Sequence, residues 1–133
     1  MTTFALGTEV TFSAAHFLPG YDGPCSKMHG HTWRVKVEYE FFGPGCLPER
    51  RMLVDFRKIK NTIRSNFDHT LLNDHPSLGD TPTAEALAEV ILYLLPKAKG
   101  LKQVIQVTVY ESDVSWVRVT DTRWQRVVDE HHC

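Results

Sequence analysis

Cysteine and net charge are both scarce in this chain of 133 residues. The three cysteines are an odd number and no two of them form a CxxC pair, which argues against a disulfide framework and fits a reducing compartment. We therefore expect a cytoplasmic protein with at least one free thiol. Fifteen Lys and Arg against sixteen Asp and Glu give a formal charge of -1. The basic excess that binding to a phosphate backbone needs is missing, so nucleic acid is not an expected partner.

Long hydrophobic runs are missing as well. The longest uninterrupted apolar stretch, residues 90–95, is far too short to cross a bilayer, and the first ten residues show no basic segment followed by an apolar one. We therefore expect neither secretion nor a membrane partner. Hydrophobic residues at 42% and charged residues at 23% are typical of a globular chain rather than a disordered one. The length predicts a single domain, residues 1–133.

Alternating side chains predict four strands. In residues 4–16, every second side chain from Val10 to His16 faces one side. From residue 31, apolar side chains alternate with charged ones: Trp33, Val35, Val37 and Tyr39 lie on one face, and Arg34, Lys36, Glu38 and Glu40 on the other. Residues 103–111 alternate again, with Ile105, Val107, Val109 and Glu111 on one side. A last strand is predicted near residues 116–120.

Two segments between these strands have helical periodicity. In the first, Asp55 is a candidate N-cap, and the apolar side chains at helical spacing are Phe56, Ile59, Ile63 and Phe67. The second begins near Thr81-Pro82-Thr83 and stops at Pro96, and its predicted buried positions are Leu87, Val90, Ile91, Leu94 and Leu95. We interpret residues 68–80, between the helices, as a polar loop. This order predicts an α+β fold, a four-stranded antiparallel sheet with both helices on one face (ββααββ).

Three histidines are candidates for a metal site. His29 and His31 are two apart at the start of a strand, so their imidazoles share a face, and a hairpin with the preceding strand would bring His16 to them. Three neutral imidazoles suit zinc, and three protein ligands with one open position are the pattern of catalytic sites. An HxH pair alone is weak evidence. The alternative is two neighbouring surface histidines, with His16 a core histidine.

Cys25 lies four positions before His29 in a loop rich in Gly and Pro. Nearby imidazoles and a metal would activate its thiol as a base or nucleophile. Cys25 could also be a fourth metal ligand in a closed structural site, or an inert small side chain. The spacing permits all three roles. No convergent partners are evident in the sequence for the remaining histidine and cysteine candidates, which are His75, Cys46, Cys133, His131 and His132.

Acidic residues at two positions are candidates for proton transfer and ligand binding. Asp68 directly precedes His69, and a carboxylate beside an imidazole can orient it for proton transfer, although a helix-end charge is the alternative. Glu111 closes the apolar face of a strand, where a carboxylate is costly unless paired. Two hydrogen bonds match a carboxylate to a guanidine-like ring edge such as that of guanine or pterin. The alternative is a strand-end residue turned to water.

Six segments, taken together, resemble the tetrahydropterin synthases of the tunnelling fold. The resemblance spans about residues 4–120, and the combination of CxxxHGH with an upstream AAH and a downstream DH is specific to that family. The segments are FSAAHFL, CSKMHGH, LVDF, FDHTLLND, TPTAE and VYES, in that order. The three-residue gap between the cysteine and HGH looks more like the 6-carboxy-5,6,7,8-tetrahydropterin synthases of queuosine and 7-deazapurine biosynthesis. The pyruvoyl-forming members often have a longer gap.

The resemblance implies a zinc-dependent lyase with Zn²⁺ on His16, His29 and His31. The other implied site residues are Cys25 as the catalytic thiol, Asp68 with His69 as a second proton-transfer pair, and Glu111, Thr83 and Glu85 around the pterin. The implied substrate is 7,8-dihydroneopterin triphosphate, which would give 6-carboxy-5,6,7,8-tetrahydropterin, acetaldehyde and triphosphate. In the alternative, a 6-pyruvoyl-tetrahydropterin synthase, triphosphate leaves and the carbon side chain survives. The chain departs from the family at Ala86, where Asn is usual, and does not align clearly beyond Trp116.

The resemblance also implies a homohexamer made of two trimers, in which subunits join edge to edge into a barrel with active sites between them. The open edges of the predicted sheet agree with this, because a monomer would have to protect them. An alternative from another class is a non-enzymatic module stabilised by zinc. Cys25 would then be a ligand, and Asp68 and His69 would be surface charges. That alternative leaves Glu111 on an apolar face unexplained.

Overall fold

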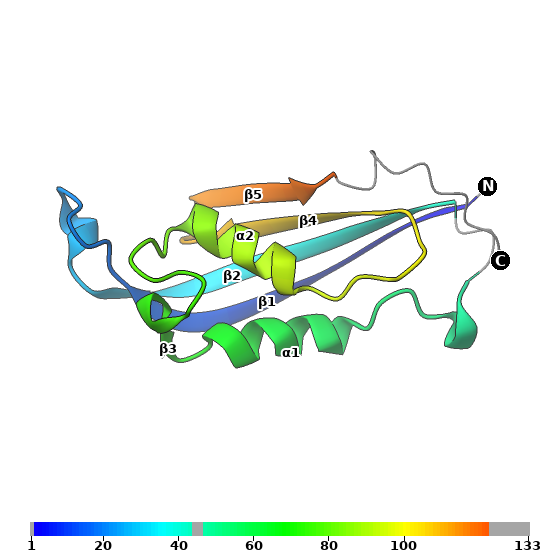
Figure 1. Cartoon of the computed structure of the whole chain (residues 1–133), viewed down its shortest axis with the longest axis horizontal. Coiled ribbons are helices and arrows are strands. Elements are labelled where there is room, and N and C mark those ends of the chain that lie inside the picture. Colours follow the sequence, from blue (N-terminus) through cyan, green and yellow to red (C-terminus); the bar gives the residue numbers. More distant parts are fainter. Residues whose placement is uncertain (1, 44–46, 123–133) are drawn as a thin grey trace.

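All strands belong to one sheet in the computed structural model of the chain, which describes residues 2–43 and 47–122. The order is β3-β1-β2-β4-β5 (Figure 1). Two long strands, β1 (Thr3–His16) and β2 (His29–Phe42), pair antiparallel along their whole length. The sheet continues antiparallel through β4 (Gln103–Tyr110) and β5 (Trp116–Asp121). The four segments with alternating side chains are therefore strands, as the sequence predicts.

The predicted four-stranded sheet is nevertheless wrong, because a fifth strand makes the sheet mixed. This strand, β3 (Thr70–Leu71), runs parallel to β1 at Ala14 and Ala15. The sequence predicts a polar loop here, because two residues are too few to show an alternation. The chain reaches the edge of β1 through His69, whose φ of 59° is left-handed and whose N–H donates to the Ser13 carbonyl at 2.7 Å.

The helix α1 (Phe56–Phe67) packs along β1. Its N-cap is Asp55, as predicted, and the Asp55 side chain accepts a hydrogen bond from the Arg57 N–H at 2.9 Å. Side chains at helical spacing, from Ile59 through Ile63 to Phe67, are buried. Phe56 is 43% exposed, so the buried stripe of this helix begins one turn later than predicted.

The helix α2 (Ala84–Leu94) packs on β4 and β5. It ends before Pro96, and its C-cap Leu95 is extended, as expected of a residue that precedes proline. Leu87, Ile91 and Leu95 are buried as predicted, whereas the predicted Val90 and Leu94 are half-buried. Both helices share one core with the inward side chains of the sheet, so both cover the same face.

The connection between β1 and β2 carries the part of the chain that matters most for function. It contains a short 3-10 helix, η1 (Pro24–Ser26), and in Figure 1 it projects from the end of the sheet opposite the N-terminus. Four of the residues considered in the sequence lie outside the described residues: Cys46, Cys133, His131 and His132. Within the described residues, no helix is long and apolar enough to cross a bilayer.

Candidate metal centre and active site

Three histidines meet where the β1–β2 hairpin ends. The register pairs His16 with His29 and Ala14 with His31, so the three imidazoles project to the same side of the sheet. The ring centroids are 4.6, 5.1 and 4.8 Å apart. One nitrogen of each ring lies within 4.8 Å of the other two, so within the described residues these three histidines form a group that can hold a metal ion.

Backbone carbonyls orient two of the rings. The His16 Nδ1–H donates to the Pro82 carbonyl at 2.8 Å, and the His29 Nδ1–H donates to the Lys27 carbonyl at 2.7 Å. An imidazole that donates from Nδ1 presents the lone pair of Nε2. His16 is only 3% exposed. Its Nε2 and the Nε2 of His31 are both buried, and neither has a hydrogen-bond partner in the described part of the chain. A metal ion would satisfy both nitrogens, so this donor set fits one.

A carboxylate stands beside His31. Glu111 directly follows β4, and its Oε1 lies 3.6 Å from the His31 Nε2, which is too long for a hydrogen bond. Burial lowers the pKa of His31 although Glu111 opposes the shift, and the neighbouring rings of His16 and His29 lower the pKa further. The neutral imidazole, which is the form that binds metals, is thereby favoured. Glu111 thus lies next to the histidine cluster.

Cys25 lies outside the cluster. Among the described residues, the group that can hold a metal does not include its sulfur. Cys25 belongs to η1, is half-buried and unpaired, and its carbonyl accepts a hydrogen bond from the Leu18 N–H at 2.7 Å. The arrangement therefore favours a three-histidine site with an open position over a closed site that includes Cys25.

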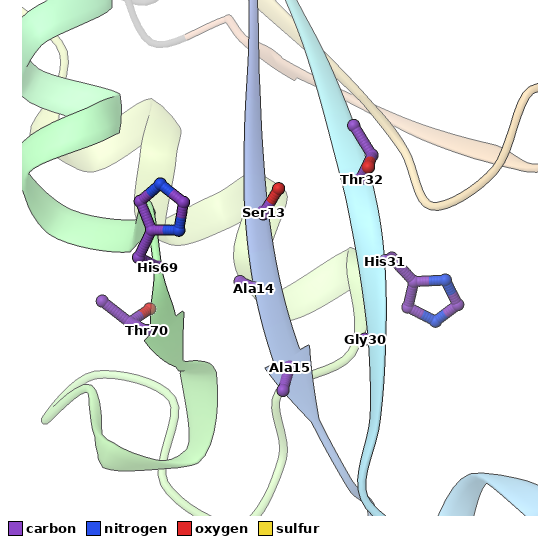
Figure 2. A pocket seen from close by; sticks show the side chains of 8 residues that line it. All are labelled: Ser13, Ala14, Ala15, Gly30, His31, Thr32, His69 and Thr70. Atoms are coloured by element: carbon purple, nitrogen blue, oxygen red, sulfur yellow. The ribbon is translucent and has the colours of Figure 1, made fainter.

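Asp68 and His69 form the second predicted pair. Asp68 Oδ1 accepts a hydrogen bond from the Ser13 N–H at 3.0 Å, and Asp68 Oδ2 lies 3.5 Å from the His69 Nε2. The His69 side chain is 82% exposed. Figure 2 shows the His69 and His31 rings on opposite flanks of the β1–β2 pair, at the borders of an open pocket of about 440 Å³. The pair forms, but within one chain it is not brought against the histidine cluster.

The sequence of the chain matches a known protein family. A family model described as 6-pyruvoyl tetrahydropterin synthase matches residues 5–122. The chain belongs to the 6-pyruvoyl tetrahydropterin synthase family. The 6-carboxy-5,6,7,8-tetrahydropterin synthase of Synechocystis sp. is 35% identical over 124 residues, which cover 86% of this chain and 92% of that protein. The protein of the same name from Bacillus subtilis is 37% identical over 95 residues, which cover 67% of this chain and 63% of that protein.

The fold of this tetrahydropterin synthase family member also has solved counterparts. The structure of Caenorhabditis elegans 6-pyruvoyl tetrahydropterin synthase matches with a TM-score of 0.70 over 92% of this chain and 98% of that chain. The two chains are 21% identical, so this likeness shows a shared fold. The resemblance found in the sequence is therefore confirmed at the level of the family.

The start of α2 holds the remaining predicted residues. Thr83 directly follows Pro82, the partner of His16, and caps the helix, since its Oγ1 accepts a hydrogen bond from the Ala86 N–H at 3.1 Å. This bond uses the Ala86 backbone, so alanine in place of the usual family Asn leaves the cap intact. Glu85 lies exposed in the first turn.

Two backbone groups that contribute to the site cannot be predicted from the sequence pattern. Pro82 and Lys27 orient the imidazoles of His16 and His29 through their backbone carbonyls. Every residue carries such a carbonyl, so no side-chain pattern distinguishes these two. For Pro82 there is an indirect signal, since it lies within TPTAE, one of the segments that carry the family resemblance.

Proposed function

We propose that this chain is a zinc-dependent lyase that converts 7,8-dihydroneopterin triphosphate to 6-carboxy-5,6,7,8-tetrahydropterin, with release of acetaldehyde and triphosphate. The observation that carries the proposal is the cluster of His16, His29 and His31, with unpartnered Nε2 atoms beside the Glu111 carboxylate. The 6-carboxy product is favoured because relatives at 35% and 37% identity carry that name. The reaction would serve queuosine and 7-deazapurine biosynthesis.

The three histidines would hold the metal through their Nε2 atoms. When bound, zinc supplies Lewis acidity toward the oxygens of the substrate side chain. The carbonyls of Pro82 and Lys27 keep the rings of His16 and His29 in the tautomer that this binding requires. A metal held by the three histidines would keep a position for substrate, because Cys25 stands outside the cluster.

Glu111 would anchor the pterin. Its two carboxylate oxygens can accept hydrogen bonds from the ring N–H and the exocyclic NH₂ in parallel, which fixes both position and orientation. Because Glu111 is only 3.6 Å from His31, a pterin held there would place its side chain toward the histidine cluster. Thr83 and Glu85 at the start of α2 would lie nearby, since Pro82 contacts His16.

Cys25 and the Asp68–His69 pair would move protons. The Cys25 thiolate would remove a proton from the substrate side chain, and His69, oriented by Asp68, would return or relay one on the other face. Asp68 suits an orienting role, because one of its oxygens is fixed by the Ser13 N–H while the other faces His69. Elimination of the triphosphate and cleavage of the side chain, which consumes one water and frees acetaldehyde, complete the reaction.

We further propose a homohexamer of two trimers, with subunits joined edge to edge into a barrel and active sites between them. This assembly accounts for the position of His69. Its exposed ring lies across the β1–β2 pair from His31 (Figure 2), so it would serve the cluster of a neighbouring subunit.

The test is to incubate the purified, zinc-loaded protein with 7,8-dihydroneopterin triphosphate and to identify the products by mass spectrometry. We expect carboxytetrahydropterin and acetaldehyde, and no turnover by a sample stripped of zinc with a chelator. A pyruvoyl product would assign the chain to the other branch of the family. No turnover, with zinc tightly held, would support the non-enzymatic module.

A further inference from the structure

The side chain of Asn73, which has no role in the proposed reaction, forms hydrogen bonds with the backbone at the edge of the site. Asn73 lies in the 3-10 helix η3 (Leu72–Asp74), 56 residues away from Phe17 in the sequence. Its Oδ1 accepts a hydrogen bond from the Phe17 N–H at 3.1 Å, and its Nδ2 donates to the Phe17 carbonyl at 2.9 Å. A single amide therefore satisfies both backbone groups of the residue that follows His16.

This contact continues a ladder along β1. The ladder begins where the Asp68 side chain and the His69 N–H bond the two backbone groups of Ser13. It proceeds through β3, whose two residues pair with Ala14 and Ala15, and Figure 1 shows β3 beside the end of β1. Beyond β3, the hydrogen bonds to the chain that continues β1 come from the Asn73 side chain instead of from backbone groups. The segment that carries Asp68 and His69 is thus tied at both ends to the strand that carries His16.

Phe17 is also the point from which the Cys25 loop departs. The next residue, Leu18, donates its N–H to the Cys25 carbonyl at 2.7 Å. Phe17, whose backbone Asn73 bonds, therefore lies between His16, which directly precedes it, and Leu18, which bonds the Cys25 backbone.

We propose that Asn73 is a positioning residue that holds His16 and the Cys25 loop at a fixed position relative to the Asp68–His69 segment. Its role is to set where these groups stand, and it takes no part in proton transfer or metal binding. The consequence for turnover rests on the proposed function, whereas the consequences for zinc affinity and for the Cys25 thiol do not.

The chain offers a matched control in Gln103. Its side-chain amide makes the same kind of clamp at the opposite end of the sheet, where Oε1 accepts from the Ala98 N–H at 3.1 Å and Nε2 donates to the Ala98 carbonyl at 2.5 Å and to the Leu101 carbonyl at 3.1 Å. Asn73→Leu and Gln103→Leu each delete an amide that bonds loop backbone. A loss of stability alone would affect both variants alike, whereas a positioning role is specific to Asn73.

The experiment compares both variants in a Cys46→Ser/Cys133→Ser background, so that Cys25 is the only thiol. Zinc affinity is measured by competition with a chromophoric chelator, and Cys25 accessibility by the rate of alkylation with iodoacetamide. We expect Asn73→Leu to weaken zinc binding severalfold, less than the roughly 10- to 100-fold that loss of a hydrogen-bond partner of a ligand costs, because Asn73 holds the backbone next to His16 and not its ring. We also expect alkylation to become severalfold faster, because release of the loop exposes the half-buried Cys25. Gln103→Leu should change neither quantity.

A graded variant covers the case in which Asn73→Leu does not fold. Asn73→Asp retains an acceptor for the Phe17 N–H but loses the donor to its carbonyl, so we expect a smaller change of the same sign in zinc affinity and alkylation rate. If turnover is established, kcat should fall in the order wild type, Asn73→Asp, Asn73→Leu, with little change in KM. Equal effects of the Asn73 and Gln103 variants on zinc affinity and alkylation would overturn the proposal, whatever reaction the protein catalyses.

Discussion

The chemistry of the site depends on which imidazole nitrogen carries the proton. Because a carbonyl only accepts hydrogen bonds, its contact with Nδ1 makes Nδ1 the donor and leaves the Nε2 lone pair available. This argument fixes the tautomer of His16 against Pro82 and of His29 against Lys27. For His31 the favourable state arises differently, because burial lowers its pKa and so favours the neutral ring. The tautomers of His16 and His29 and the neutral state of His31 therefore all favour metal binding.

Removing one ring should abolish tight zinc binding. We predict that His16→Ala weakens zinc affinity by more than the roughly 10- to 100-fold that loss of an outer-shell partner costs, because a ligand itself is lost. Zinc competition with a chromophoric chelator measures the change. His69→Ala is the control, since that ring is exposed and apart from the cluster, and it should bind zinc like the wild type. Unchanged affinity in His16→Ala would contradict the three-histidine site.

Cys25 provides a test between catalysis and ligation. We predict that Cys25→Ala keeps the zinc stoichiometry of the wild type and lowers kcat about 10²- to 10⁴-fold, which is the usual contribution of a positioned acid or base. The reason is that the Cys25 sulfur stands outside the metal-binding group of the described residues. Metal analysis and steady-state kinetics on the same sample measure both quantities. Loss of zinc together with activity would instead make Cys25 a ligand.

The Glu111 carboxylate can bind the pterin or interact with the His31 ring, and one substitution separates these two roles. Glu111→Gln replaces a charged acceptor with a neutral amide, and hydrogen bonds to charged groups are worth about 1.5–3 kcal/mol. We therefore predict that pterin affinity, followed by fluorescence quenching, falls about tenfold or more while zinc affinity stays constant. The opposite pattern, weaker zinc binding with unchanged pterin affinity, would show that the carboxylate acts on His31, 3.6 Å away.

At the scale of elements, the sequence predicted what local patterns determine and missed what long-range pairing determines. The convergence of His16 with His29 and His31 could be predicted because strand alternation in a hairpin allows few registers. The cap Asp55 could be predicted because its side chain bonds an N–H group within the next turn. The parallel pairing of β3 with β1 could not, because it joins two residues to a strand 56 positions earlier and shows no periodicity. The position of His69 relative to the cluster follows from that pairing and was missed with it.

The start of α2 links helix stability to the site through Thr83. We predict that Thr83→Ala lowers the free energy of unfolding by about 1 kcal/mol, because the Ala86 N–H loses its acceptor. Urea denaturation followed by circular dichroism measures the change. Thr83→Ser keeps the hydroxyl, so its stability should stay close to that of the wild type. A Thr83→Ala variant as stable as Thr83→Ser would show that the cap contributes nothing.

At the scale of the whole molecule, two edges of the sheet have no strand partner over most of their length in the described part of the chain. Among the described residues, β1 pairs with β3 only at Ala14 and Ala15, so the outer edge of residues 3–13 has no strand partner, and β5 pairs with β4 alone. Exposed edges of this length invite pairing with another chain. The proposed barrel would close both edges, and it would bring the exposed His69 of one subunit to the cluster of the next.

The β1 edge can be blocked without disturbing the hairpin. Ser13 directs both its backbone groups away from β2, toward Asp68 and His69. Because backbone groups alternate along a strand, the N–H of Glu9 points to the same open edge. Proline at an edge position removes an outward N–H and is otherwise tolerated, and the residue before it, Thr8, is already extended.

We therefore predict that Glu9→Pro folds but does not assemble. Light scattering after size-exclusion chromatography should give six times the 15.2 kDa chain mass for the wild type and a single chain mass for the variant. Glu9→Ala loses the 3.6 Å contact with Arg34 but keeps the N–H, so it should remain assembled. In that control the edge stays intact, which separates strand pairing from surface charge. A monomeric wild type, or a Glu9→Pro variant that still assembles, would contradict pairing through this part of β1.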